Sequence, residues 1–183
     1  MELCCEFRRM LLESYWRRTD HFNKETVSST DNADHPDIIA WPPLIFLASA
    51  VVSAVAHFVY PIRVMRPTTA VLVGVLLAAF SGSFAIWAVR TMKAAGTNVR
   101  PDRPALSIVK SGPYRFTRNP MYLSLCLFQL AIGFFLNGWT PVLCAVVLGV
   151  VLHFGVIARE ETYLEGKFGE QYLSLKRQVR RWL

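Results

Sequence analysis

Two short polar segments of this chain carry residue types that could bind a charged ligand. The first runs from Gly112 to Tyr122 and holds Arg115, Arg118 and the helix-opening pair Asn119-Pro120. The second is the carboxylate pair Glu160-Glu161, some forty residues later. A helix N-terminus beside arginines attracts an anionic group, whereas carboxylates suit hydroxyls or an ammonium group. If the fold brings the segments together, they form one polar site.

Long apolar stretches surround both segments. Of the 183 residues, 53% are hydrophobic and only 18% are charged, which is typical of membrane proteins. A hydrocarbon core about 30 Å thick needs roughly 20 apolar residues per helix, and lipid admits only helices or closed barrels. We therefore expect an all-α integral membrane protein with about four transmembrane helices, at residues 41–60, 70–89, 120–136 and 139–158.

The short link between the last two spans places the two polar segments on one side of the membrane. Residues 136–139 leave room only for a tight antiparallel hairpin, so Glu160 should lie close to residues 119–122. In the second span, Gly74, Ala78 and Gly82 recur every four residues. This spacing predicts a face where helices pack closely, with a chance scatter of small residues as the alternative.

Lysine and arginine are distributed unevenly between the two sides. The N-terminal tail, the loop from Arg90 to Arg118 and the segment from Arg159 hold five, seven and six of them, 18 of the 20 in the chain. Because cationic loops stay in the cytoplasm, both termini and the active-site loop are predicted to be cytoplasmic. The net charge of +7 follows from this asymmetry and suits anionic lipid headgroups; we expect no nucleic-acid partner.

Residues 1–37 differ in composition from the membrane domain at 38–183. From Thr19 to Asp37 they are polar without an apolar period, and residues 1–37 are predicted to form a flexible cytoplasmic tail, in which Phe7 to Trp16 could form a short surface helix. Cys4 and Cys5 of this tail are either palmitoylated or inert. The four cysteines show neither a disulfide framework nor metal-ligand spacing, so no metal site is expected.

Two further segments flank the predicted site. The loop at 93–118 contains glycines and prolines that rule out one long helix, and a loop of this length is usually functional or disordered. Residues 159–182 predict an amphipathic interfacial helix, because apolar residues recur every three or four positions from Leu164 to Trp182. Such a helix could roof the site, anchor the chain to the surface, or do both.

The order and spacing of these motifs resemble the isoprenylcysteine carboxyl methyltransferases and their bacterial relatives, which share a superfamily with phospholipid N-methyltransferases. The resemblance covers roughly residues 90–182. It rests on Gly112, Pro113, Tyr114, Arg118, Asn119, Pro120, Met121, Tyr122, His153, Glu160, Glu161, Leu164, Phe168, Gly169 and Tyr172. The chain departs from the pattern at two positions. Eukaryotic members have histidine where this chain has Asn119, and they have an arginine linked to substrate binding where this chain has Val156.

The resemblance implies a membrane methyltransferase that uses S-adenosylmethionine and a lipophilic acceptor, with its site in residues 93–122 and 153–172. The acceptor group would be a carboxylate of a prenylcysteine-like or other small lipophilic molecule. Glu160 would bind a polar group of the cofactor. The other implied cofactor-binding residues are Leu106, Ser107, Ile108 and Val109 through their backbone, Tyr114 and Tyr122 through their rings, and Asn119, Pro120 and Met121 as lining.

The acceptor side of the reaction leaves several readings open. Arg118 or Arg159 could hold a carboxylate, and Glu161 could orient an amine or take its proton. His153 either bonds to a neighbouring helix or belongs to the acceptor site. The alternatives are a phospholipid, amine or thiol methyltransferase, a nicotinamide-dependent sterol-type reductase, and a non-enzymatic membrane scaffold. The sequence gives no indication of the oligomeric state.

Overall fold

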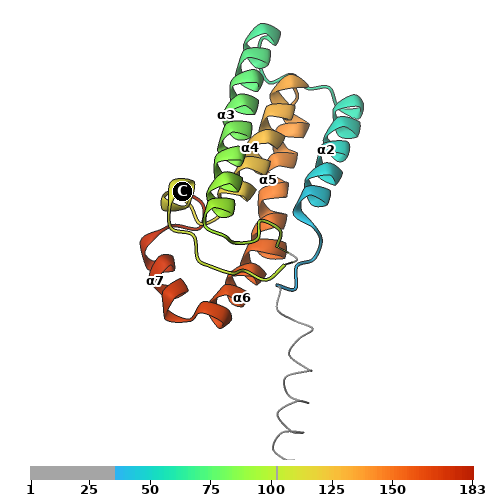
Figure 1. Ribbon diagram of the computed structural model, residues 1–183. Helices are drawn as coiled ribbons and strands as arrows, with labels where there is room; N and C mark the ends of the chain where they lie inside the picture. The colour runs from blue at the N-terminus through green and yellow to red at the C-terminus, as the bar shows by residue number, and fades with distance from the viewer. Residues whose placement is uncertain (1–35, 102) are drawn as a thin grey trace, which may run out of the picture. The chain divides into compact units, whose positions relative to one another are not determined.

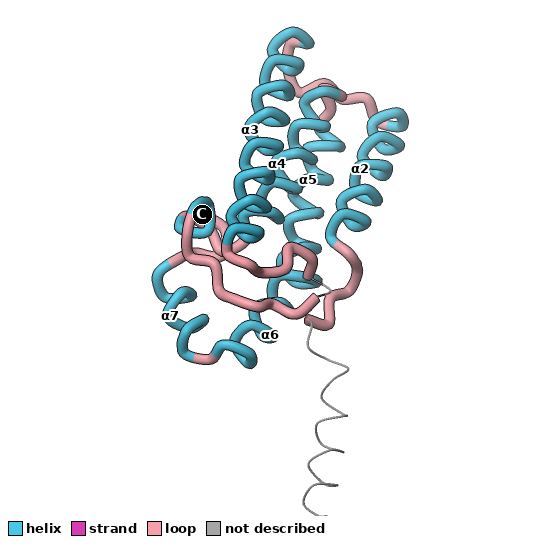
Figure 2. Tube along the Cα trace, in the orientation of Figure 1, coloured by secondary structure: helices cyan, strands magenta, loops and turns pink. Residues whose placement is uncertain are grey.

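The computed structural model describes residues 36–101 and 103–183. Four helices run side by side as a bundle (Figures 1 and 2): α2 (Pro42–Val59), α3 (Pro67–Ala94), α4 (Pro120–Phe135) and α5 (Trp139–Leu152). A 3₁₀ turn, η1 (Gly112–Arg115), precedes α4, and a π-helical turn, η2 (His153–Ile157), joins α5 to α6 (Ala158–Phe168) and then α7 (Glu170–Gln178). The predicted tail at 1–37, with Cys4 and Cys5, lies almost entirely outside the described residues.

Within residues 36–101 and 103–183, three helical runs are long and apolar enough to cross a membrane: α2, α3 and the continuous run Trp139–Phe168. The helix α4 is apolar too, but its 16 residues span only about 24 Å at 1.5 Å per residue. The prediction of an all-α integral membrane protein is confirmed, while the count of four spans stays a prediction. Prolines at the first turns of α2, α3 and α4 begin these helices, as proline does where no backbone donor is needed.

The helix α4 lies at the centre of the bundle, against α3 and α5. At Gly74 of α3, an added Cβ would come within 3.1 Å of the Phe135 ring and 3.3 Å of the Ala131 carbonyl oxygen. At Gly82, two turns further on, a Cβ would meet nothing within 4 Å. The predicted small-residue face therefore allows close packing at Gly74 and opens onto empty space at Gly82, near the middle of α3.

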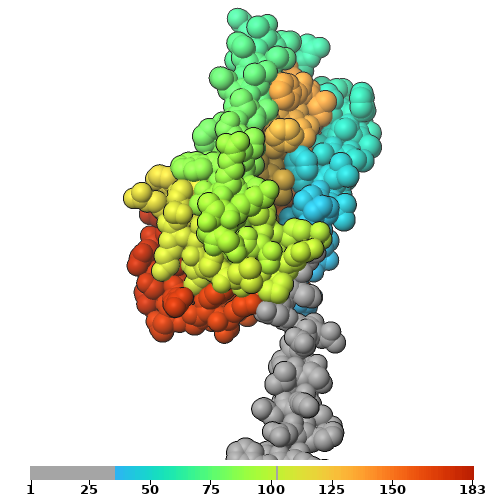
Figure 3. All heavy atoms as spheres, in the orientation of Figure 1, coloured from blue at the N-terminus to red at the C-terminus, as the bar shows by residue number. Residues whose placement is uncertain are grey.

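The two connections at one end of the bundle are hydrogen-bonded to each other. Asn137, at the turn between α4 and α5, accepts from the Met65 amide at 3.1 Å and donates to the Met65 carbonyl at 2.9 Å. The amide of Trp139 donates to the carbonyl of Ile62 at 3.1 Å. The predicted hairpin is thus present. The opposite end carries the loop after α3, together with α6 and α7, and Figure 3 shows this yellow-green loop beside the red C-terminal segment.

The C-terminal region differs from the sequence prediction of one helix over residues 159–182, which is wrong. The helix is interrupted at Gly169, whose φ of 51° and ψ of −128° favour glycine, and α7 ends at Gln178. Residues 179–183, which we call the strap, leave the helix and fold back onto residues 117–119. The amphipathic region is therefore two short helices and a strap.

Candidate functional site

A recess opens beside the N-terminal end of α4 and holds about 880 Å³ of empty space, its open mouth included. Its walls come from the loop after α3, the η1–α4 junction, α6 and α7. Most of the predicted site residues line it: Ser107, Ile108, Val109, Tyr114, Arg118, Asn119, Pro120, Met121, Tyr122, Glu160 and Glu161. The predicted residues Leu106, His153 and Arg159 are not part of this lining. The fold therefore brings the two polar segments together, as the hairpin predicts.

The loop wall of the recess is tied down by side chains that sequence reasoning did not single out. The hydroxyl of Thr97 accepts from the amides of Leu106 at 3.0 Å and Ser107 at 3.4 Å, and the Tyr163 hydroxyl of α6 accepts from the amide of Ala105 at 3.3 Å. Leu106 itself is 62% exposed. These bonds give the long loop a defined path without a helix or strand.

The backbone groups of the next loop residues, Ile108 and Val109, are available for a ligand. Within the described part of the chain, no hydrogen bond occupies the backbone of Ile108 or Val109, although Val109 is buried. Buried backbone groups are nearly always paired. A ligand in the recess can supply the missing partners.

Glu160 joins α6 to α4. Its Oε2 accepts a hydrogen bond from the Tyr122 hydroxyl at 2.8 Å. Among the described residues, no lysine or arginine forms an ion pair with Glu160. Burial, and next the Glu160 carboxylate, raise the pKa of the Tyr114 phenol, so this ring stays protonated. The recess thus contains a carboxylate that has no ion-pair partner within the described residues.

The π-helical turn sets the direction in which the two carboxylates point. Each residue of an α-helix advances about 100°, so an extra residue in a turn rotates everything that follows. Gly155 sits in this turn beside Ile39, whose amide donates to the Gly155 carbonyl at 3.3 Å, and a Cβ there would approach the Ile39 side chain to 2.9 Å. The turn is accommodated because glycine leaves room for the chain before α2.

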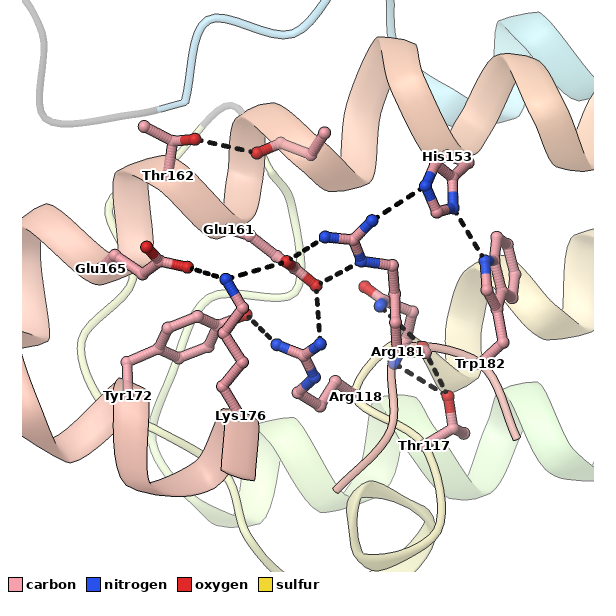
Figure 4. Close-up of polar contacts among 12 residues, drawn as sticks. Thr117, Arg118, His153, Glu161, Thr162, Glu165, Tyr172, Lys176, Arg181 and Trp182 are labelled. Carbon is pink, nitrogen blue, oxygen red and sulfur yellow. Dashed lines mark hydrogen bonds and ion pairs between the residues drawn. The ribbon is translucent and has the colours of Figure 1, made fainter. Parts of the chain in front are cut away.

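Glu161 is the centre of a cluster of cations (Figure 4). It is only 4% exposed, and Arg181 donates to it through Nε at 2.9 Å and Nη2 at 2.6 Å. Arg118 Nη2 lies 3.2 Å from the same carboxylate, and Lys176 Nζ lies 3.9 Å away. The hydrogen bonds from Arg181 leave few lone pairs on Glu161 for a ligand or a proton.

Arg118 lies between Glu161 and the recess. Its side chain is 7% exposed, Nη1 donates to the Tyr172 hydroxyl at 3.4 Å, and Nε is buried with no hydrogen-bond partner among the described residues. Burial, and next the Glu161 carboxylate, raise the pKa of Tyr172, so its hydroxyl stays protonated. An unpartnered donor on a buried arginine is costly, and an anionic or carbonyl group of a ligand would satisfy it.

The remaining predicted residues face other surroundings. Asn119 does not cap α4 with its side chain; the side-chain amide donates to the Arg181 carbonyl at 2.9 Å instead. His153 contacts Arg181 and Trp182, and it borders an apolar groove on α4 and α5 rather than the recess. Arg159 is partly exposed and donates to the Asp37 carbonyl at 3.0 Å.

A second, apolar cavity adjoins the recess on the membrane side. It lies among α2, α3 and α4 and holds about 870 Å³, mouth included, with lining from Gly82, Ala85 and Phe128. Met121 and Tyr122 line both spaces, as does the loop segment Val99-Arg100-Pro101. The first turn of α4 is therefore a wall between a polar recess and an apolar cavity.

Arg181 is the residue that the sequence analysis missed most clearly. The sequence places it in a basic cluster off the apolar stripe, which indicates a solvated face. In the structure it reaches Glu161 and His153 from a distance of 20 and 28 residues along the chain. The adjacent Trp182, an apolar residue beside arginines, is the one local signal that this segment packs inward.

Comparison with known proteins adds two findings. A family model described as phospholipid methyltransferase matches residues 69–171, more than half of the chain and most of the recess. A protein of Haemophilus influenzae, described as uncharacterized, is 48% identical over 63 residues. Those residues are 34% of this chain and the whole of that relative.

Proposed function

This chain belongs to the phospholipid methyltransferase family, and from that premise we propose that it transfers a methyl group from S-adenosylmethionine to a lipophilic acceptor at the membrane surface. It is an integral membrane methyltransferase by family and by its apolar helices. The cofactor lies in the polar recess, and the acceptor extends from the apolar cavity. The acceptor group is a carboxylate of a prenylcysteine-like or other small lipophilic molecule.

The unpaired carboxylate of Glu160 carries the proposal. S-adenosylmethionine has a sulfonium, an ammonium and two ribose hydroxyls, all of which suit a carboxylate without a cation of its own. Tyr114 and Tyr122 line the same recess and offer ring faces, which attract a sulfonium. The free backbone groups of Ile108 and Val109 suit the polar edge of the adenine. The recess thus offers suitable protein groups to the sulfonium, the ammonium, the ribose hydroxyls and the adenine of the cofactor.

For methyl transfer, the protein mainly has to align the cofactor and the acceptor. When bound, the cofactor supplies an activated methyl group, which moves in line to a nucleophilic atom of the acceptor while the electrons of the broken bond return to sulfur. Holding two reactants in this geometry contributes roughly 7 to 11 kcal/mol. The residues that we assign to alignment are those of the first turn of α4, where Met121 and Tyr122 separate the two spaces.

Arg118 favours an anionic acceptor group. Its buried Nε has no hydrogen-bond partner in the part of the chain that the structure describes, and Glu161 and Tyr172 hold the rest of its guanidinium beside the recess. Arg159 lies at Asp37, so we assign the carboxylate to Arg118 rather than to Arg159. With both its oxygens bound by arginines, Glu161 fits a role in holding Arg118 better than one as a base.

A second candidate is methylation of a phospholipid amine, which the family description favours. Here the acceptor nitrogen would lose its proton to water or to Glu160, and Arg118 would bind the lipid phosphate. Both candidates use the same recess and the same cavity. They differ only in the acceptor group at the wall.

Two measurements test the proposal. S-adenosylhomocysteine titrated calorimetrically into the detergent-purified protein should bind saturably, and the reduced nicotinamide cofactor should not. Transfer of a radiolabelled methyl group should then be compared between N-acetyl-S-farnesylcysteine and phosphatidylethanolamine. Transfer to the first supports the carboxylate acceptor, and transfer to the second supports the phospholipid. Binding of the nicotinamide cofactor alone would favour a reductase, and binding of neither to a folded protein would favour a scaffold.

A further inference from the structure

We propose that the strap at residues 179–183 completes the recess from outside, with Arg181 as a positioning residue that holds Arg118, Asn119 and Glu161 in their binding orientation. The inference rests on the proposed function, because these three residues line the recess assigned to the cofactor. Arg181 is not itself part of that lining. Its effect on binding therefore passes through the residues that it holds.

The backbone of the strap bonds to the three residues that precede α4. The Arg180 carbonyl accepts from the Arg118 amide at 3.0 Å. The Arg181 carbonyl accepts from the Thr117 hydroxyl at 3.1 Å and from the Asn119 side-chain amide at 2.9 Å. Residues before a helix lack intrahelical partners, so outside acceptors determine their conformation. The strap supplies these acceptors.

The side chain of Arg181 fixes the carboxylate next to Glu160. Its Nε and Nη2 donate to the two oxygens of Glu161 as a parallel fork, the geometry that restricts a carboxylate most. Arg118 pairs with the same carboxylate, so the orientation of Arg118 depends on Glu161 and hence on Arg181. A buried carboxylate needs such partners, because its charge is costly without them.

The neighbouring Trp182 anchors the strap. Its indole N–H donates to His153 Nδ1 at 3.1 Å, and the two rings stack at 16° with centroids 6.4 Å apart. The same indole packs against the buried cluster that contains Tyr122, Leu152 and Val156. Arg181 Nη1 approaches the other ring nitrogen of His153 at 2.8 Å. His153, which borders the apolar groove and not the recess, therefore holds the strap in place.

The chain offers a matched control for Arg181. Arg180 precedes it in the strap and is exposed, and its only hydrogen bond among the described residues is made by its backbone carbonyl. Arg181→Gln and Arg180→Gln both remove one positive charge from the same segment. Only the first removes the fork on Glu161. Arg181→Lys, a third variant, keeps a cation near Glu161 without the fork.

The test combines affinity with a readout that needs no ligand. Titration of S-adenosylhomocysteine into the full chain should give about tenfold weaker binding for Arg181→Gln, the loss of about one charge-assisted hydrogen bond. Arg180→Gln should stay within about twofold of wild type, and Arg181→Lys should recover part of the loss. Hydrogen exchange of residues 117–122, measured without ligand, should be faster in Arg181→Gln than in Arg180→Gln. Thermal melting in the same detergent identifies variants that do not fold.

The outcomes separate this inference from the proposed function. If wild type binds the probe and Arg181→Gln binds it as well as Arg180→Gln does, the strap does not position the site, and the methyltransferase assignment stands. If wild type does not bind, that assignment falls, and exchange alone decides: equal rates at 117–122 in the two variants overturn the role of the strap. Should Arg181→Gln fail to fold, Arg181→Lys carries the test, and wild-type affinity with wild-type exchange in that variant overturns the inference.

Discussion

Replacing Glu160 with glutamine should separate cofactor binding from folding. The carboxylate has one hydrogen bond from Tyr122, at 2.8 Å, and no cation among the described residues. Hydrogen bonds to charged groups contribute about 1.5–3 kcal/mol, and each 1.4 kcal/mol is a factor of ten. Glu160→Gln should therefore weaken binding of S-adenosylhomocysteine by about ten- to a hundredfold.

The fold should tolerate this change. A glutamine carbonyl still accepts from the Tyr122 hydroxyl, so the link between α4 and α6 remains. A loss below about 1 kcal/mol lowers the melting temperature of a chain of this size by no more than about 2–4 °C. Glu170→Gln is the matched control, because that carboxylate is 82% exposed and pairs only with Arg177 at 3.4 Å among the described residues.

Calorimetry with two probes shows which ligand group Glu160 contacts. S-adenosylhomocysteine has the amino-acid group, and 5′-methylthioadenosine keeps the nucleoside but lacks it. If Glu160 binds the ammonium, Glu160→Gln affects only the first probe; if it binds the ribose hydroxyls, both weaken together. Wild-type affinity of folded Glu160→Gln for both probes would refute the reasoning and remove Glu160 from the site.

Three further substitutions test other parts of the structure. Arg118→Ala should lower kcat/KM for methyl transfer at least about tenfold. Arg63 is exposed at the opposite end of the bundle, so Arg63→Ala should change kcat/KM less than twofold. Equal effects of the two substitutions would mean that Arg118 only sets the membrane topology. Gly82→Phe should fill the apolar cavity and raise KM for a long-chain acceptor; weaker binding of S-adenosylhomocysteine would contradict this placement. Gly138→Ala should cost about 1–3 kcal/mol of unfolding free energy, because its Cβ would clash with the His57 ring; thermal melting measures this, and His57→Ala should relieve it.

The membrane helices were largely predictable, because their signals are local. Apolar runs preceded by proline place α2 and α4 within one residue of their predicted bounds. The helix α3 continues past its predicted end at residue 89 to Ala94, because Arg90 and Lys93 end an apolar run without ending a helix. Charged residues indicate where a span leaves the lipid, but they do not determine where its helix ends.

The C-terminal region shows where local signals fail. The apolar stripe from Leu164 to Trp182 keeps helical spacing, yet Gly169 breaks the helix and the strap leaves it. The strap's partners are residues 117–119, more than sixty positions earlier in the chain. The spacing of apolar residues within one segment cannot predict a contact with residues so far away along the chain.

The recess was predictable in part for the same reason. Motif order identified eleven of the residues that line it. Arg159, one residue before the lining carboxylate of Glu160, follows a π-helical turn and points to Asp37 instead. Along a helix, neighbours differ by about 100°, so an extra residue upstream decides which of them faces inward. Arg159 and Glu160 thus lie on different faces.

The shared wall at the first turn of α4 restricts the acceptors that the proposed reaction can use. Met121 and Tyr122 border both the polar recess and the apolar cavity, so a methyl group leaving one space must be received at this wall. The cavity beyond it is lined mainly by apolar residues such as Gly82, Ala85 and Phe128, and the one charged lining residue that the structure describes, Arg100, belongs to the loop that borders both spaces. Burial of an apolar chain there is favourable by about 0.8 kcal/mol per methylene, whereas a charged group would have to be desolvated. We therefore infer that the acceptor has its reactive group at the level of the helix N-terminus and its apolar part among α2, α3 and α4.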